Sequence, residues 1–458
     1  MRAFHLTRIL VVMGLPGLFG CTDYTTLMVT DNELSWGSDV ENFVLTGQVK
    51  SDDGASASLW FHNNESNEGY EVVFHNGPID GTLKTGSLVA VRNLYRSLAQ
   101  DTTWNDFEIA VRQKNISIKI NGTAVVCYTE PTEPWRDEKH SLQRIGSGTF
   151  RFVGHGGRTT FRNLSLRQLA ASEVNPSDTL PPIDEQHDSI IRLQQKGFPV
   201  IDYHVHLKGG LTKEHAHAMS MNYGINYGVA PNLGEGGVGR MLANDQEALE
   251  YYNEVKPLPF LMGAQGEGRR WIVQFSEDAI SRFDYLFTDA MTVVDNGAIC
   301  RIYRPEEVLM RGRTRQQYMD MIVDQTVKIL ANEPADIYAN ATFIPENWMN
   351  AYDCLWTDER VDKVLEVLEE NGIAMEISPR YKIPSFDIIR KAKERGIKFT
   401  FGTNNVDADF GRCEYAVEAI SACGLEASDI WFPSMSRRKD RKPVDYNHFG
   451  STIEQETP

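Results

Sequence analysis

The sequence predicts two domains of different fold class, an all-β sandwich followed by an α/β barrel. Residues 35–168 consist of short β-rich runs separated by turns rich in Gly, Asn and Asp, which is typical of a sandwich. The sequence then becomes polar and proline-rich. From residue 199 onward, apolar strand-like segments alternate with helical segments about seven times, which favours a parallel barrel. We therefore expect the fold to change near residue 170.

The composition is that of a folded protein and argues against a nucleic-acid partner. The chain has 458 residues, of which 41% are hydrophobic and 24% charged, so it is long enough for more than one domain with a core of its own. It contains 46 Lys and Arg against 63 Asp and Glu, a net charge of -17. Because a surface of that sign repels phosphate backbones, we expect no binding to nucleic acid.

Residues 1–20 have the layout of a secretory signal peptide. Two arginines accompany an apolar run at residues 9–15, and the triplet Leu-Phe-Gly at residues 18–20 comes directly before Cys21. This ending resembles the bacterial lipobox, in which the cysteine is lipidated and becomes the first residue of the mature protein. The resemblance implies a lipid anchor at Cys21, and so a membrane partner and a location in the bacterial cell envelope. The alternative is a short buried helix followed by an ordinary cysteine.

The sandwich is expected to cover residues 22–168. Its predicted strands are rich in β-branched and aromatic residues and are bounded by turn-forming residues. Asn121-Gly122 predicts a tight hairpin, because both residues tolerate positive φ. The predicted strands lie at residues 43–46, 57–61, 70–74, 107–111, 116–120 and 149–152.

A linker and a helix are expected at residues 169–198, the barrel at residues 199–433 and a disordered tail at residues 434–458. The clearest barrel helices are predicted at residues 358–372 and 385–396, where apolar residues recur at helical spacing and a glycine ends each helix. The predicted barrel strands lie at residues 200–203, 225–229, 260–262, 284–287, 336–339, 373–377 and 398–401.

The first predicted barrel strand ends in Asp202-Tyr-His204-Val-His206. Residues two apart in a strand face the same side, so His204 and His206 would project together, as two imidazoles must to share a metal ion. Core histidines also produce this pattern by chance. Its place at the first strand of the α/β domain favours a metal site.

Polar residues also stand where other predicted strands end. Such a repeated placement predicts an active site at the carboxyl end of the barrel. For each residue taken alone the alternative is a turn or a cap, because Asn is a favoured loop residue. The candidate catalytic residues are Glu267 and Asp289, and the candidate substrate contacts are Asn340, Glu376, Arg380, Asn404 and Asn405.

Residues 199–433 resemble the polymerase-and-histidinol-phosphatase (PHP) group of metal-dependent hydrolases. The resemblance lies in the opening His204-x-His206 and in the closing Phe-Thr-Phe-Gly-Thr-Asn-Asn at residues 399–405. It implies a (β/α)7-type barrel that binds two or three divalent metal ions.

The sequence departs from the pattern of that group at three places. Pro231-Asn232 stands where the group has Asp-His, Asn340 where it has a histidine, and Asn404-Asn405 where it has Asp-x-His. Because Asn is a poorer ligand than His or Asp for a transition metal, we expect one divalent ion, zinc or manganese. The carboxylate that does not bind the ion would act as a base. The expected ligands are His204, His206 and a carboxylate, Glu267 or Asp289.

The β-rich part resembles the 3-keto-disaccharide hydrolase domain, a concanavalin-like jelly-roll sandwich. The resemblance is carried by residues 69–76, 85–95, 104–109, 118–122 and 154–164. It implies a carbohydrate substrate, because members of that family process glycosides oxidised at carbon 3. They eliminate the aglycone to form a 2-hydroxy-glucal, or hydrate that product.

The same resemblance implies a catalytic set within the sandwich. Glu71 and His75 are four apart in a predicted strand and face one side, which suits a base and its partner. Arg92 and His155 would polarise the ketone. The alternative is a sandwich that only binds sugar, on stacking platforms formed by Trp60, Tyr70 and Tyr95.

Three functions remain open on the sequence. The first is an envelope enzyme that cleaves or hydrates 3-keto glycosides in one or both domains. The second is a metal-dependent phosphoesterase or other hydrolase in the barrel, with a sugar-binding sandwich. The third is a non-catalytic glycan-binding lipoprotein. The second requires cationic phosphate contacts, for which the candidates are Lys208, Arg269, Arg380 and Arg412.

Overall fold

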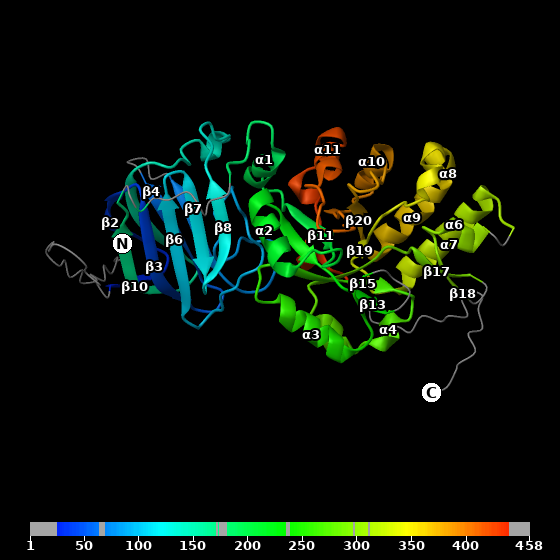
Figure 1. Ribbon diagram of the computed structural model, residues 1–458, viewed down its shortest axis with the longest axis horizontal. Coiled ribbons are helices and arrows are strands. Elements are labelled where there is room, and N and C mark those ends of the chain that lie inside the picture. The colour runs from blue at the N-terminus through cyan, green and yellow to red at the C-terminus, as the bar shows by residue number, and fades with distance from the viewer. Residues whose placement is uncertain are drawn as a thin grey trace, which may run out of the picture.

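The computed structural model describes residues 25–63, 69–170, 173, 181–234, 239–295, 298–309 and 312–438. Figure 1 shows two lobes side by side, one formed by the N-terminal strands and the other by the strands and helices that follow. The predicted signal peptide, the lipidation site at Cys21 and most of the predicted tail lie outside these residues. None of the helices within these ranges is long and apolar enough to cross a membrane.

The N-terminal lobe is the predicted antiparallel β-sandwich, with an arrangement consistent with a jelly roll. It consists of a six-stranded sheet and a four-stranded sheet, and all strand pairs within them are antiparallel. In spatial order the first sheet contains β1 (Thr25–Val29), β10 (Thr159–Gln168), β3 (Phe43–Ser51), β6 (Asn105–Arg112), β7 (Asn115–Ile120) and β8 (Thr123–Thr129). The second contains β2 (Glu33–Val40), β9 (Gly148–His155), β4 (Ser56–Asn63) and β5 (Tyr70–His75).

The facing sides of the two sheets form the core of the sandwich. Along β3 and β5, buried and half-buried residues alternate, so every second side chain points inward. Phe43 of the first sheet packs edge-on against Phe61 and Phe150 of the second. The predicted hairpin is confirmed, because β7 pairs with β8 and both Asn121 and Gly122 have positive φ.

The second lobe is a closed barrel of seven parallel strands, as the sequence predicts. Each strand pairs with the next one along the chain, and β21 pairs with β11 to close the ring. The barrel strands are β11 (Ile201–Val205), β12 (Asn226–Val229), β15 (Leu261–Glu267), β16 (Tyr285–Thr288), β19 (Ile337–Tyr338), β20 (Ala374–Ile377) and β21 (Phe399–Phe401). The short strands β13 (Asn232–Gly234) and β14 (Met241–Leu242) extend the sheet from β15, and β17 (Thr292–Asp295) and β18 (Ala298–Arg301) form a separate hairpin.

Helices connect the barrel strands and surround them (Figure 1). The two predicted helices are confirmed: α9 ends at Gly372, which has a φ of 64°, and Ser385 caps α10 by accepting a hydrogen bond from the N–H of Ile388. The α-helices are α1 (Ser189–Gln195), α2 (Lys213–Tyr223), α3 (Asp245–Val255), α4 (Trp271–Gln274), α5 (Glu277–Ser281), α6 (Pro305–Leu309), α7 (Arg315–Asn332), α8 (Tyr352–Leu355), α9 (Asp358–Asn371), α10 (Phe386–Glu394) and α11 (Glu414–Ala422). Short 3-10 helices are η1 (Glu138–His140), η4 (Glu346–Ala351), η5 (Ala427–Asp429) and η6 (Pro433–Met435).

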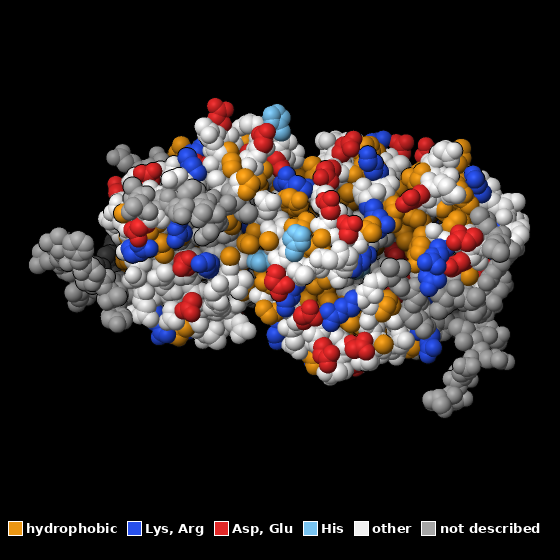
Figure 2. Space-filling model, in the orientation of Figure 1, with side chains coloured by type: hydrophobic (Ala, Val, Ile, Leu, Met, Phe, Trp, Pro, Cys, Tyr) orange, Lys and Arg blue, Asp and Glu red, His pale blue; other side chains and the backbone are white. Residues whose placement is uncertain are grey.

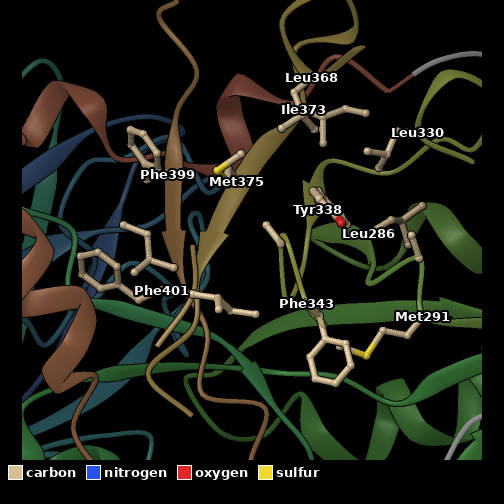
Figure 3. Packing of buried hydrophobic residues seen from close by; sticks show 14 of the residues in the cluster. Leu286, Met291, Leu330, Tyr338, Phe343, Leu368, Ile373, Met375, Phe399 and Phe401 are labelled. Atoms are coloured by element: carbon tan, nitrogen blue, oxygen red, sulfur yellow. The ribbon is translucent and has the colours of Figure 1, made fainter. Parts of the chain in front are cut away.

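The barrel core lies between the strands and the helices that surround them. Figure 3 shows part of it, where Met375 of β20 lies beside Phe399 of β21, and Ile373 lies beside Leu368 of α9. Apolar side chains on the outer side of each strand are thereby removed from water, which is the main favourable term in folding. This packing fixes the positions of the strand ends.

The loop between β5 and β6 of the sandwich packs against the amino-terminal end of the barrel. Tyr95 of this loop shares a buried cluster with Ile201, Leu261 and Ala374, each at the start of a barrel strand. The centroid of its ring lies 5.3 Å from that of Phe432. The sandwich therefore covers one end of the barrel and leaves the carboxyl ends of the strands to form a site.

Candidate active site at the barrel mouth

The carboxyl ends of the barrel strands bring together the polar residues that the sequence placed there. His204 comes from β11, His206 from the residue after it, Glu267 from the end of β15, Asp289 from the residue after β16, and Glu376 from β20. All of these side chains are buried. Asp202 supports this end of the barrel, because its Oδ1 accepts the N–H of His204 at 3.1 Å and the N–H of Thr403 at 3.0 Å.

The two imidazoles meet through their Nε2 atoms, which lie 3.1 Å apart. Nδ1 of His206 is 2.8 Å from the carbonyl oxygen of Ala230, and Nδ1 of His204 is 2.8 Å from Oε2 of Glu376. Burial lowers the pKa of His206 well below its usual range, so this ring is neutral. Each ring is thus held from behind with its Nε2 turned toward the other.

Gln265 links the histidines to the two carboxyl groups. Its Nε2 donates to Oε1 of Glu267 at 3.1 Å and to Oδ2 of Asp289 at 3.0 Å. Its Oε1 lies 3.2 Å from Nε2 of His204. The remaining oxygens are also bonded, since Glu267 accepts from the Thr292 hydroxyl at 2.6 Å and Asp289 from the N–H of Met291 at 2.9 Å.

Glu267 and Asp289 form a buried pair of carboxyl groups. Burial and the neighbouring charge of Asp289 raise the pKa of Glu267 to about 8. Burial also raises the pKa of Asp289. Two buried like charges that share one amide donor favour a state with a single proton on the pair. Such a pair can give a proton to one substrate atom and take a proton from another.

These residues form the floor of an open cavity of about 700 Å³, which we call the barrel-mouth pocket. Aromatic side chains form its wall, and Lys208, Arg380 and Asn404 also line it. Burial and the charge of Arg380 lower the pKa of Lys208 to about 8. The size of the cavity is within the range of small-molecule sites. The floor consists of His206, Gln265, Glu267 and Asp289, and the aromatic wall of Tyr303, Phe343 and Tyr381.

The predicted metal ligands come together only in part. Within the described ranges, no three His, Cys, Asp or Glu side chains lie close enough together to hold a metal ion. His204 and His206 meet as predicted, but the amide of Gln265 lies between them and Glu267. Both rings keep the orientation that metal-binding histidines have, with Nδ1 bonded to a carboxylate or a carbonyl. The two imidazoles therefore suit a metal ion, whereas Glu267 is not placed as a ligand.

Several predicted substrate contacts have structural roles instead. Glu376 is 1% exposed and holds His204, and its other oxygen accepts the N–H of Asn340 at 2.7 Å. Asn405, also 1% exposed, accepts from the N–H of His206 at 2.7 Å and donates to its carbonyl oxygen at 3.0 Å. In the structure these two side chains position the histidines, and contact with a substrate stays a prediction for both.

Asn340 is fully buried at the end of β19, and its side-chain amide has no hydrogen-bond partner among the described residues. A buried polar group usually has a partner, so a water molecule or a bound ligand is expected there. Arg380 and Asn404 line the barrel-mouth pocket as predicted. Of the other cations, Arg269 pairs with the buried Glu333 at 2.9 Å and Arg412 pairs with Asp188.

The residues predicted to be catalytic in the sandwich do not assemble into one site. Glu71 and His75 face the same side of β5, but four residues of a strand span about 13 Å, so the two do not touch. Glu71 instead accepts a hydrogen bond from Ser58, and burial raises its pKa. His155 lies across from Ser56 on β4, which in turn lies across from His75.

Arg92 and Tyr95 lie at the contact with the barrel, away from a place where a sugar could stack or a ketone be polarised, so both roles stay predictions that the structure does not support. Arg92 is 3% exposed and donates to the hydroxyl of Ser220 in α2 at 2.7 Å. Tyr95 is 4% exposed and packs among barrel residues. Tyr70 is also fully buried and donates to Glu130. Only Trp60 of the proposed stacking residues is partly exposed.

Sequence reasoning missed Gln265, the residue that connects the two halves of the site. It lies two positions before Glu267 in the same strand and therefore faces the same side. The spacing that identified His204 and His206 would have identified it as well. Tyr303 and Tyr381 come from loops and have no comparable signal.

Comparison with known families and structures gives a family match within the sandwich. Residues 29–167 match a carbohydrate-active family, the 3-keto-alpha-glucoside-1,2-lyase-like domain. No curated protein matches the chain. The solved structures similar to part of it include a candidate glycosyl hydrolase from Parabacteroides distasonis, with 17% identity, a TM-score of 0.28 and coverage of 31% of this chain and 76% of that chain.

The carbohydrate-binding module CBM66 from Bacillus subtilis is also similar to part of the chain, with 11% identity and a TM-score of 0.23. The similarity covers 32% of this chain and 93% of that module. An alginate lyase, AlyC3, has 13% identity and a TM-score of 0.21, with coverage of 32% of this chain and 75% of the lyase.

Proposed function

We propose that this protein is an enzyme that eliminates the aglycone from glycosides oxidised at carbon 3, and that the reaction takes place in the barrel-mouth pocket. The observation that carries the proposal is the buried pair Glu267 and Asp289 at the floor of a cavity also lined by Lys208 and Arg380. The family match of residues 29–167 supports the class of substrate.

The carboxyl pair suits elimination because that reaction needs a base and an acid together. A ketone at carbon 3 acidifies the hydrogen on carbon 2. Asp289 takes this proton as the bond from carbon 2 to hydrogen breaks, and a double bond forms between carbons 1 and 2. The bond from carbon 1 to the aglycone oxygen breaks, and Glu267 gives its proton to that oxygen. The products are the free aglycone and a 2-hydroxy-glucal that keeps the ketone at carbon 3.

The roles of the two acids follow from their surroundings. With a pKa of about 8, Glu267 keeps its proton at neutral pH and can act as the acid. Lys208 lines the pocket, so its amine can stabilise negative charge on the ketone oxygen. A divalent ion held by His204 and His206 would act as a Lewis acid toward the same oxygen.

The envelope location of the enzyme is proposed from the sequence of residues 1–21, which has the order of a lipoprotein signal. A lipid anchor at Cys21 would hold both domains at a membrane surface. Figure 2 shows acidic and basic side chains interspersed among the described residues on the face that it presents. A Cys21→Ser variant that stays in the membrane fraction of the producing bacterium would rule the anchor out.

The proposal is tested with a 3-keto glucoside that carries a chromogenic aglycone. We expect Asp289→Asn to lower kcat by about 100-fold to 10,000-fold, the range for loss of a general base. We expect Glu71→Gln, on the sandwich face, to change kcat by less than about twofold, since Glu71 is far from the pocket. If Glu71→Gln abolishes release and Asp289→Asn does not, the reaction belongs to the sandwich and the barrel assignment is wrong.

A second candidate is a metal-dependent phosphoesterase in the same pocket. It is favoured by Lys208 and Arg380, two cations that line the cavity together with His206. A chromogenic phosphate ester separates the two candidates. Phosphate release that is lost in Lys208→Ala, without aglycone release from the keto sugar, would select the phosphoesterase. No turnover of either substrate, with retained sugar binding, would select a glycan-binding lipoprotein.

A further inference from the structure

We propose that the barrel-mouth pocket binds one divalent metal ion through Nε2 of His204, Nε2 of His206 and Oε1 of Gln265. In this arrangement Glu267 and Asp289 are positioning residues for the Gln265 amide and are not ligands. The inference deepens the proposed function, on which it rests for the place of the ion beside the reacting sugar. Its test needs no substrate.

The hydrogen-bond partner of Nδ1 determines which nitrogen of each histidine ring carries the lone pair. The carbonyl oxygen of Ala230 can only accept, so the hydrogen of His206 is on Nδ1, 2.8 Å away, and Nε2 carries a lone pair. The Glu376 carboxylate likewise accepts from Nδ1 of His204, because its other oxygen already accepts the N–H of Asn340. Because Nδ1 of each ring is bonded to an acceptor, Nε2 is the coordinating nitrogen of each ring, and the two Nε2 atoms lie 3.1 Å apart.

The orientation of Gln265 adds a third lone pair to the same place. Two carboxylate oxygens, which are acceptors, lie 3.1 Å and 3.0 Å from one end of the amide, so that end is the NH2 group. The oxygen end then points to His204, with 3.2 Å between Oε1 and Nε2. Three coordinating atoms therefore converge on one place, Nε2 of both histidines and Oε1 of Gln265, which suits a metal ion.

The spacing of these atoms suits a metal ion. Two histidine nitrogens bound tetrahedrally to zinc at about 2.0 to 2.1 Å are separated by about 3.3 Å, close to the 3.1 Å between the two Nε2 atoms. Imidazole and carbonyl ligands without thiolate favour a borderline divalent ion such as zinc. His206 and Gln265 both line the cavity, so a fourth position would face the substrate, as in catalytic metal sites.

Glu267 and Asp289 would influence the ion only indirectly, through the side-chain amide of Gln265. Glu267 and Asp289 hold the NH2 group and so fix the direction of Oε1. The carboxyl groups of Asp289 and Glu376 each lie one hydrogen bond from a ligand and would balance part of the charge of the ion, whereas Glu267 keeps its proton. This arrangement differs from the ligand set expected from the sequence, in which Glu267 binds the ion directly.

The experiment measures metal content and affinity in the full-length protein. After chelation, the protein is dialysed against Zn²⁺ and, separately, against Co²⁺, whose visible absorption reports the ligand field. We expect one ion per chain, no binding in His204→Ala, and at least about tenfold weaker binding in Gln265→Leu, with a changed cobalt spectrum. Glu267→Gln is expected to weaken binding less than Gln265→Leu does. Gln325→Leu, a change at a buried glutamine of α7, is the matched control.

Two results would overturn the ligand set. If Glu267→Gln abolishes binding and Gln265→Leu does not, the carboxylate is the ligand. If the wild-type chain binds no metal ion, the proposed site is wrong. Gln265→Met replaces Gln265→Leu if the latter fails to fold, as judged by circular dichroism. If the wild-type protein binds one ion but releases no aglycone from the 3-keto glucoside, the proposed reaction is refuted and the metal site stands.

Discussion

The guanidinium of Arg92, in the sandwich, donates a 2.7 Å hydrogen bond to the hydroxyl of Ser220, in the barrel. The two residues are 128 positions apart in the chain. Arg92 is 3% exposed, and its Nε and Nη1 have no hydrogen-bond partner in the part of the chain that the structure describes. Burial lowers the pKa of this guanidinium to about 10. A cation thus lies buried at the domain contact without a carboxylate beside it.

Replacing this arginine by methionine is expected to leave the protein as stable or more stable. Arg92→Met keeps most of the volume and removes a poorly compensated buried charge, so we expect a gain of about 1 to 4 kcal/mol in the free energy of unfolding. Arg92→Ala leaves a cavity and should cost about 2 to 4 kcal/mol. Urea unfolding measures both. A methionine variant less stable than the wild type would show that the charge itself is needed.

The ion pair between Arg96 and Asp284 is expected to couple the two domains. Arg96 Nη1 lies 2.7 Å from Asp284 Oδ2, and the two side chains are 16% and 17% exposed. Because solvent screens this pair little, a double-mutant cycle with Arg96→Ala and Asp284→Ala should give a coupling energy of about 1 to 2 kcal/mol. The cycle uses the full chain and urea unfolding. Strictly additive single effects would mean that the pair does not stabilise the contact.

His62 is expected to make stability depend on pH. Its Nε2 lies 3.0 Å from the carbonyl oxygen of Glu41, and its Nδ1 accepts the N–H of Gly146 at 3.4 Å, so the buried ring is neutral. Burial lowers its pKa from 6.5 to about 4. Between these values the unfolded chain binds a proton that the folded chain does not. The stabilisation is therefore present above pH 6.5 and is lost as the pH falls toward 4.

The neutral His62 ring contributes about 3 kcal/mol to the free energy of unfolding above pH 6.5, since one unit of pKa corresponds to about 1.4 kcal/mol. We expect His62→Gln to reduce the loss of stability between pH 7 and pH 4.5, measured by urea unfolding at each pH. His215→Gln, at an exposed position of α2, is the control and should leave the pH dependence unchanged. Parallel curves for the His62→Gln variant and the wild type would contradict the prediction.

Gly402 leaves the space that the hydrogen bond between His204 and Glu376 needs. A Cβ at this position would overlap Oε2 of Glu376 and lie 2.8 Å from Cβ of His204. Gly402→Ala should therefore displace Glu376 and weaken metal binding by about 10-fold to 100-fold, the range for loss of a partner behind a ligand. Dialysis with Zn²⁺ measures it. Gly146→Ala, where a Cβ meets nothing within 4 Å, is the control.

Both folds could be predicted from the sequence because each depends on local patterns. Alternation of apolar and polar residues, as in β3 and β5, reports a strand with one buried face. The predicted barrel strands and the helices ending at Gly372 and Gly396 have signals within a few residues. The histidine pair was predictable for the same reason, since His204 and His206 are two apart in one strand.

Contacts between distant segments were not predictable in this way. Glu71 and His75 share a face, but the same strand geometry that aligns them separates them by about 13 Å. Arg92 and Tyr95 have the residue types of a sugar site and are buried against the barrel. Glu376 follows the strand-end pattern and holds a histidine from behind. In each case the residue type correctly indicated a polar or aromatic contact. The residue that it contacts lies in another part of the chain.

The sequence by itself determined the two fold classes, their order along the chain and the strand ends at which polar residues gather. Only the tertiary structure decided that the sandwich covers one end of the barrel and that Gln265 stands between the histidines and the carboxyl groups. The physical reason is the range of the interactions. Strand and helix patterns arise from neighbours within a few residues, whereas a site forms where barrel closure brings several strand ends together.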